Sequence, residues 1–321
     1  MLKIDKKITN SLKNLDEINQ IISNKFFGQK KIIEQVLSCM IASGNTLLVG
    51  VPGLGKTLLF QTLSDSLNLI SNRIQCTPDL MPSDILGTEI MNPDDIKKFT
   101  FIKGPVFSQL LMVDEINRAS PRTQSALLQA MQEGFITING KNFLLPKPFI
   151  VLATENPIEQ EGTYTLPEAQ LDRFLMHINI SYPDSETEKK ILTNFSNNNQ
   201  INKIFDSKKL LELIRISSEL PVGDSVVDYT LNLIRLLRPE STKFNYVKKY
   251  IKWGPGPRGG QALIRAAQAR ALIRGNLSPS IADIISLAEP CLRHRISLTF
   301  EAKTEQLKPD YLIKKICNDL N

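Results

Sequence analysis

Short apolar runs alternate with helical patterns over the first half of the chain. Three runs, residues 46–49, 110–113 and 149–153, have the length and composition of strands that are buried on both faces of a parallel sheet. Each run is followed by a loop or by a helix with apolar residues three or four positions apart. This order predicts an α/β domain built on a doubly wound parallel sheet.

Helical periodicity dominates the two ends of the chain. It predicts an N-terminal helix over residues 1–24 and a second helix near residues 32–40. A stretch rich in Asn and Ser at residues 194–202 is interpreted as a linker. Beyond it, four further helices are predicted around residues 210–217, 226–237, 261–273 and 281–292. We therefore expect an α/β core over residues 25–190 and a small all-helical lid domain over residues 200–321.

A glycine-rich loop separates the first apolar run from a predicted helix. It fits the pattern G-x-x-x-x-G-K-[ST] and consists of Gly50, Val51, Pro52, Gly53, Leu54, Gly55, Lys56 and Thr57. Glycines let successive backbone N–H groups face an anion, and the helix start adds the positive end of its dipole. Lys56 is expected to contact the β and γ phosphates of ATP, and Thr57 to supply a hydroxyl ligand for Mg²⁺. The strand before the loop and the helix after it argue against the alternative of a chance match.

Polar residues also end the second and third apolar runs. Asp114 is expected to hold the Mg²⁺ shell and Glu115 to polarise the water that attacks the γ-phosphate, the alternative being two solvated loop acids. Asn156 is expected beside Glu115, where its amide can orient the water. Its alternative role is a simple Asn-Pro turn with Pro157. Together these residues indicate hydrolysis rather than binding alone.

Two arginines complete the set of candidate site residues. Arg173 lies in the string Leu-Asp-Arg-Phe, and an arginine delivered to a neighbouring active site would stabilise charge on the transferring phosphoryl group. A surface salt bridge with Asp172 is the alternative. Arg258 follows Pro257 at the start of a lid helix, from where it is expected to reach back to the nucleotide. Its alternative is a helix-start arginine that faces solvent.

Composition narrows the protein classes without identifying one. The chain is 42% hydrophobic and 22% charged, and it has neither a membrane-length apolar run nor a secretory signal, so we expect a cytoplasmic protein with no membrane insertion. Four separated cysteines and two histidines argue against a zinc or disulfide framework. A net charge of +6 permits nucleic-acid contact. Residues 243–253 interleave lysines with aromatics, which suits either a stacking platform for single strands or an anchor to the domain itself.

The motifs, in this order, resemble those of AAA+ ATPases and, within that superfamily, the MoxR group. The resemblance covers nearly the whole chain. Besides the glycine loop and the strand-terminal residues, it rests on a Gly-x-x-Pro-Arg helix start at Arg258. It also rests on long local strings at residues 51–57, 77–87, 104–107, 114–121 and 162–170.

The resemblance implies a role for each candidate residue. Residues 50–57 correspond to Walker A, Asp114 and Glu115 to Walker B, Asn156 to sensor 1 and Arg258 to sensor 2. Arg173 is the candidate arginine finger, with Arg118 and Arg122 as alternatives near an expected subunit boundary. One departure is Gly256, which stands where relatives often have a Ser before the Pro-Arg pair, so we expect a weaker helix cap.

The resemblance also implies two excursions from the core. A helix-2 insert is expected at about residues 88–103, and a pre-sensor-1 hairpin with an Asn-Gly turn at about residues 134–148. In the family, both project toward the pore or the partner surface.

Three functions are compatible with the motifs to different degrees. The first is an ATPase that works as a homo-oligomer, a hexameric ring, and remodels or matures client proteins such as von Willebrand factor A proteins or recipients of metal cofactors. The alternative is an AAA+ ATPase that acts on nucleic acid, such as a helicase loader, although no recognisable nucleic-acid module follows the lid. A small-molecule kinase fits poorly, because the acid pair, the strand-terminal Asn and a separate arginine are not typical of that class.

Overall fold

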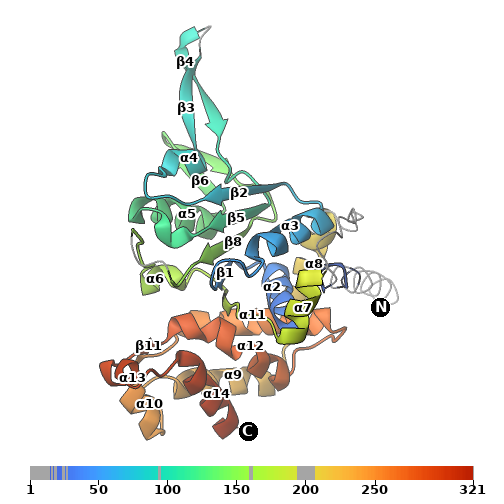
Figure 1. The fold of residues 1–321 in the computed structure, drawn as a ribbon, viewed down its shortest axis with the longest axis vertical. Helices are drawn as coiled ribbons and strands as arrows, with labels where there is room; N and C mark the ends of the chain where they lie inside the picture. Colours follow the sequence, from blue (N-terminus) through green and yellow to red (C-terminus); the bar gives the residue numbers. More distant parts are fainter. Residues whose placement is uncertain are drawn as a thin grey trace.

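Five parallel strands form the central sheet in the part of the chain that the structure describes (Figure 1). Every pair of neighbouring strands is parallel, so their carboxyl ends share one edge of the sheet. This confirms the predicted parallel sheet. In spatial order the strands are β2 (Ser71–Gln75), β5 (Leu110–Asp114), β8 (Ile150–Glu155), β1 (Thr46–Val49) and β9 (Met176–Asn179).

The computed structural model describes residues 15, 17, 20–23, 26, 28–92, 95–158, 162–193 and 207–320. The helix expected over residues 1–24 lies mostly outside these residues, and the linker expected at 194–202 lies wholly outside them. The described residues of the first segment are helical, and two of them, Leu15 and Ile22, are buried in the core.

Alternating side chains of the strands enter two separate hydrophobic cores. On β5, Leu110 and Met112 belong to the first core, whereas Leu111 and Val113 belong to the second. Helices cover both faces, which explains why the strands read as continuous apolar runs. The first core is closed by α2 (Lys30–Ile41), α3 (Lys56–Leu67) and the C-terminal helices, and the second by α5 (Pro121–Glu133). Shorter elements complete this part: α4 (Pro82–Leu86), η1 (Ile116–Arg118), α6 (Glu168–Leu171) and α7 (Ser185–Thr193).

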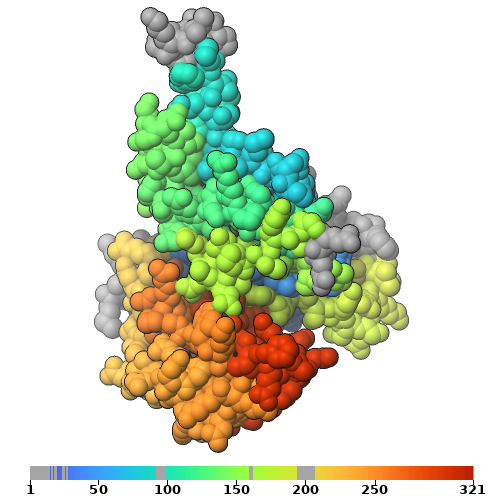
Figure 2. Space-filling view, turned by 90° about the vertical axis from the view of Figure 1, so that its left-hand side faces the viewer, coloured from blue at the N-terminus to red at the C-terminus, as the bar shows by residue number. Residues whose placement is uncertain are grey.

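Two antiparallel hairpins rise from the core and contact each other (Figures 1 and 2). The longer one, which we call the arm, consists of β3 (Gly87–Asn92) and β4 (Asp95–Lys103); the shorter one consists of β6 (Phe135–Ile138) and β7 (Lys141–Leu144). The rings of Phe101 and Phe143 lie 4.3 Å apart, and the Asn139 amide donates to the Glu89 carboxylate at 2.6 Å. Asn139 and Gly140 turn the short hairpin with φ of 48° and 76°, as an Asn-Gly turn requires.

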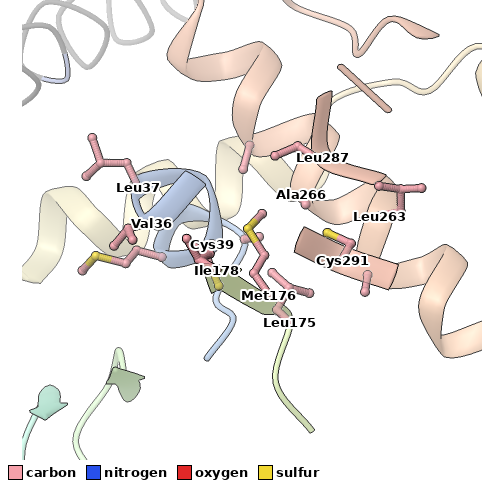
Figure 3. Close-up of a cluster of buried hydrophobic side chains, with 14 of the residues drawn as sticks. Val36, Leu37, Cys39, Leu175, Met176, Ile178, Leu263, Ala266, Leu287 and Cys291 are labelled. Carbon is pink, nitrogen blue, oxygen red and sulfur yellow. The ribbon is translucent and has the colours of Figure 1, made fainter. Parts of the chain in front are cut away.

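The C-terminal part, residues 207–320, is mainly helical and packs directly on the core. Helix α11 contacts α2, and α12 contacts β9. Figure 3 shows the shared apolar cluster, in which Leu263 and Cys291 lie near Met176. Among the described residues, no helix is both long and apolar enough to cross a membrane. The elements are α8 (Ser207–Glu219), α9 (Asp224–Leu236), α10 (Asn245–Tyr250), β10 (Ile251–Trp253), α11 (Pro257–Ile273), α12 (Ile281–Leu292), η2 (Arg293–Arg295), β11 (Ser297–Leu298), α13 (Phe300–Thr304) and α14 (Pro309–Leu320).

Candidate functional site

The glycine loop joins the carboxyl end of β1 to the start of α3. Gly53 and Gly55 have φ of 83° and 77°, in the left-handed region that glycine enters without strain. Gly50 is equally constrained, because a Cβ there would lie 2.7 Å from the carbonyl oxygen of Ile180. Above Gly53 an added Cβ would meet nothing within 4 Å, so the loop borders open space. A helix start without a side-chain cap beside such space suits an anion such as phosphate.

Lys56 is the first residue of α3, and its ammonium lies against the loop. Its Nζ donates to the carbonyl oxygens of Gly50 and Glu155, at 2.6 and 3.3 Å. Burial raises the pKa of the Glu155 carboxyl, and the charge of Lys56 opposes that shift. Thr57 follows in the same helical turn and is half-buried. The ends of β1 and β8 are thereby joined at the point where the loop begins.

Asp114 and Glu115 lie at the same edge of the sheet, at the end of β5. The Thr154 hydroxyl, from β8, donates to Asp114 Oδ1 and accepts the backbone N–H of Glu115 at 2.9 Å. The other Asp114 oxygen lies 2.6 Å from the guanidinium of Arg73 on β2. One buried hydroxyl therefore fixes the position of both acids.

The backbone of Glu115 is left-handed, with φ of 54° and ψ of 53°. This conformation is uncommon for a residue with a side chain and costs on the order of 1–3 kcal/mol. It ends the strand at Asp114, so Glu115 does not continue the alternation of side chains between the two faces of β5. That carboxylate accepts hydrogen bonds from Gln75 Nε2 at 2.9 Å and from Arg118 Nη1 at 3.0 Å.

Asn156 follows β8 and contributes the third strand end at this edge. Its side chain is buried, and its Oδ1 accepts the backbone N–H of Ile158 at 3.2 Å across Pro157. The local turn weighed as an alternative is therefore present. The carboxamide nitrogen is the part of this side chain that can donate to a water or a phosphate oxygen.

Arg173 and Arg258 lie together, away from the glycine loop. Both line a cavity of about 380 Å³, whose wall includes Gly44 and Asn45 just before β1 and Leu175 just before β9. The cavity is therefore at the amino edge of the sheet, whereas the glycine loop is at the carboxyl edge.

The two arginines differ in what they contact there. The Arg173 guanidinium donates to Gln132 Oε1 and, at 3.5 Å, to the carbonyl oxygen of Leu128, both on α5. Arg258 is largely exposed and lies 3.6 Å from the Asp172 carboxylate. The ion pair of Asp172 that was weighed for Arg173 is made instead by Arg295, at 2.7 Å, and more distantly by Arg258.

Arg258, which was expected to reach back to the nucleotide, lies at the amino edge of the sheet and not beside the glycine loop of the same chain, and its role stays a prediction. Its helix, α11, packs on α2, and α12 packs on β9. This packing brings the start of α11 beside Asp172 at the amino edge of the sheet. The location of Arg258 is determined by the packing of the lid helices. The local Pro-Arg motif does not indicate that location.

Three residues that join the acids to the sheet were not expected at the site from the sequence. They are Arg73, Gln75 and Thr154. Gln75 ends β2 and pairs in register with Asp114, but β2 was not among the strands expected from the sequence. Thr154 and Arg73 lie inside strands, where polar side chains have many other roles.

The lysine- and aromatic-rich stretch at residues 243–253 is largely engaged within the lid. The rings of Phe244 and Tyr246 stack with centroids 5.3 Å apart, and the Tyr250 hydroxyl donates to Glu305 at 2.8 Å. Lys249 pairs with Glu301 and Glu305 at 2.9 and 3.3 Å. These contacts favour an anchoring role over a platform for nucleic-acid bases.

Two family models match the chain. The model described as "ATPase family associated with various cellular activities (AAA)" matches residues 45–176, and "AAA lid domain" matches residues 244–316. Chaperone MoxR1 of Mycobacterium tuberculosis is 39% identical over 302 residues, covering 94% of this chain and 79% of that protein. Protein MoxR of Paracoccus denitrificans is 29% identical over 303 residues, covering 88% of each. A crystal structure of a candidate ATPase from Cytophaga hutchinsonii matches with a TM-score of 0.91 at 37% identity, covering 99% of this chain and 98% of that one.

These similarities extend over both the sheet with its glycine loop and the C-terminal helices. They confirm the resemblance that the motifs suggested, and with it the fold class and ATPase activity. The chain belongs to the MoxR family of AAA+ ATPases.

Proposed function

We propose that this ATPase binds ATP with Mg²⁺ at the glycine loop and hydrolyses it with Glu115 as the group that activates water. The observation that carries the proposal is the meeting of three strand ends at one edge of the sheet. Lys56 connects the ends of β1 and β8 through Gly50 and Glu155, and Thr154 connects β8 to Asp114 and Glu115. Phosphate, metal and water would each find a suitable group within this cluster.

The donor groups fit Mg²⁺, which prefers oxygen ligands. The hydroxyl of Thr57 and a carboxylate oxygen of Asp114 would hold it, and when bound it would neutralise phosphate charge. Lys56 would leave its carbonyl contacts to meet the phosphates. Glu115 would accept a proton from the attacking water, and the amide of Asn156 would orient that water.

Two substitutions test these roles separately. Lys56→Ala should abolish ATP binding, because it removes the cation held at the loop, whereas Glu115→Gln should bind ATP normally and lose turnover. Lys308→Ala, which removes an exposed lysine of the lid, is the control and should change neither. Fluorescent-nucleotide titration and phosphate release measure the two steps. Equal losses of nucleotide affinity in both site variants would contradict the assignment.

The placement of Arg173 and Arg258 supports a ring of identical subunits, for which we propose six members. Both lie at the amino edge, so they can meet a phosphate only if another copy brings its glycine loop to that edge. Mixing tests this: Arg173→Ala subunits, which should keep only a small residual rate, and inactive Lys56→Ala subunits should recover part of the activity together. A monomer with full ATPase activity would refute the ring.

We further propose that the ATPase cycle remodels partner proteins in the cytoplasm. The arm carries exposed apolar side chains, among them Ile90, Met91 and Phe99, which suit contact with another protein. A relative that is named a chaperone supports the same role. Clients with a von Willebrand factor A domain, or recipients of metal cofactors, are the classes that the family resemblance implies. A pull-down with the Glu115→Gln variant in ATP would identify the client, and recovery of nucleic acid alone would contradict the proposal.

A further inference from the structure

Arg295 is a buried arginine of the lid that reaches the core segment around Arg173. It belongs to η2 and is only 4% exposed. Its Nε lies 2.7 Å from Asp172 Oδ1, and its Nη2 lies 3.1 and 2.9 Å from the carbonyl oxygens of Asp172 and Phe174. Nη1 donates to the carbonyl oxygen of Leu175 at 3.4 Å and also to that of Cys291 in the lid.

These contacts hold the backbone on both sides of Arg173. A guanidinium is planar and presents five N–H donors in a fixed arrangement. Acceptor atoms that bind the same guanidinium are therefore held at fixed positions relative to one another. The carboxylate of Asp172 balances the buried charge, which would otherwise be costly. The base of the Arg173 side chain is therefore fixed to the lid, while its guanidinium rests on α5.

Asp172 contacts the second candidate arginine as well. Its Oδ2 lies 3.6 Å from Arg258 Nη1, while Oδ1 accepts from Arg295. Arg258 is 73% exposed, so this ion pair contributes little stability. The contact does place Arg258 beside the carboxylate that Arg295 fixes, so both candidate arginines lie next to Asp172.

We propose that Arg295 and Asp172 are positioning residues that hold Arg173, through its own backbone segment, in a fixed relation to the lid, for use on a neighbouring subunit's nucleotide. The inference rests on the proposed function, in which Arg173 acts across a subunit boundary. Because the contacts join the lid to the core, movement of the lid would also move the segment that carries Arg173.

A double-mutant cycle tests whether Arg295 acts through Arg173. Arg295→Lys keeps the charge but replaces five N–H donors in a fixed plane with three on a single nitrogen, so it cannot reach all of these acceptors at once. We therefore expect kcat to fall about tenfold or more while the KM for ATP changes less than about twofold. Adding Arg295→Lys to Arg173→Ala should then reduce kcat no further. A merely structural role would give losses that multiply, with a changed KM, and that result would overturn the proposal.

The matched control is Arg293→Lys. Arg293 belongs to the same short helix, but its ion pairs are with Asp310 and Glu289 inside the lid, at 2.9 and 3.9 Å. The Arg293→Lys variant should lower the melting temperature. Any effect that it has on kcat should multiply with the effect of Arg173→Ala, unlike the effect of Arg295→Lys. If Arg295→Lys fails to fold, Asp172→Asn takes its place in the cycle, with the same expectation. Equal patterns for Arg293→Lys and the test variant would refute the inference.

Mixed assemblies separate failure of this inference from failure of the proposed function. Arg295→Lys subunits have an intact glycine loop, so they should recover activity with Lys56→Ala subunits, which have an intact Arg173. They should recover none with Arg173→Ala subunits. Full activity of Arg173→Ala alone would refute the proposed arginine finger. A strongly impaired Arg173→Ala beside a fully active Arg295→Lys would refute only the positioning role.

Discussion

The guanidinium of Arg73 lies 2.6 Å from Oδ2 of Asp114, on the neighbouring strand of the sheet. Asp114 is the carboxylate proposed to hold Mg²⁺. One of its two oxygens is therefore already paired with the positive charge of a protein side chain. The Arg73 side chain is 46% exposed, so the pair contributes little to folding stability. Its consequence is for metal binding, because Arg73 and Mg²⁺ compete for the same negative charge.

Replacing Arg73 with Gln should therefore lower the Mg²⁺ concentration that gives half-maximal ATPase activity, by about threefold to tenfold. Such a factor corresponds to about 0.6–1.4 kcal/mol, the order of a partly exposed charge interaction. The measurement is a Mg²⁺ titration of phosphate release at saturating ATP. Arg215→Gln, which removes an exposed arginine paired with Glu219 on α8, should leave the titration unchanged. A higher Mg²⁺ requirement in Arg73→Gln would mean that Arg73 assists the site.

Thr154 should be required for activity although it was not a candidate from the sequence. Thr154→Val keeps the shape of the side chain but leaves the Asp114 oxygen and the Glu115 N–H without their shared partner. We expect a loss of stability of about 1–3 kcal/mol and a kcat reduced at least tenfold, because the two acids proposed to hold Mg²⁺ and to activate water lose their common support. Urea unfolding and steady-state kinetics measure the two effects. Thr154→Ser retains the hydroxyl and should restore most of the activity, and failure of that rescue would count against this role.

The fold class could be predicted from local patterns, because the residue composition of each core strand indicates whether both of its faces are buried. Leu110 to Val113 face two cores in alternation, and a run that is apolar on both faces indicates a sheet covered on both sides. The strand-end positions of Asp114 and Asn156 followed from the same reasoning, because parallel strands place their carboxyl ends at one edge. Their catalytic roles stay predictions.

The position of Arg258 did not follow from the sequence, because it depends on contacts between distant elements. The Pro257-Arg258 start of α11 is visible as a local motif, but its location is set where α11 packs on α2. Arg295 and the residues that it contacts, 172–175, are more than a hundred positions apart along the chain. Neither relationship has a local pattern that a single sequence displays.

The exposed apolar residues of the two hairpins should serve a partner rather than the fold. Phe99 and Leu144 are 60% and 79% exposed, so Phe99→Ser and Leu144→Ser should leave the melting temperature and the basal ATPase rate unchanged. Stimulation of the ATPase by a client should fall, because the apolar contact is lost. Phosphate release with and without the client captured by the Glu115→Gln variant is the measurement.

Ile136 is the matched comparison for these hairpin variants. It lies in the hairpin expected at about residues 134–148, which the family resemblance places toward a partner, but it is only 4% exposed and belongs to the second core. Ile136→Ser should therefore destabilise the protein by about 3 kcal/mol or more and lower the basal rate through unfolding. A stable Ile136→Ser variant that lost only client stimulation would reverse the assignment of these surfaces.

The protein should lose stability as the pH falls below about 6.5, in part because of two neighbouring histidines between core and lid, the buried His294 and the half-buried His177. The rings of His177 and His294 lie 5.9 Å apart. Burial lowers the pKa of His177 to about 4, with the charge of Arg293 acting in the same direction, and it lowers the pKa of His294 well below its usual value. Between about pH 6.5 and pH 4 the unfolded chain therefore binds protons that the folded chain does not. Stability falls with pH in that window, by up to about 1.4 kcal/mol per pH unit for each histidine.

Removing one of these histidines isolates its share of the acid sensitivity. His177→Gln cannot titrate, so its free energy of unfolding should fall less steeply than that of the wild type between pH 6.5 and pH 4.5. The difference in slope should approach one proton, and over the full window it should amount to about 3 kcal/mol. Urea unfolding at several pH values gives both slopes, and the carboxylates cancel in the comparison because both proteins contain them. Identical slopes would show that His177 binds a proton as readily in the folded protein as in the unfolded chain, contrary to the effects of desolvation and of the Arg293 charge on its protonated form.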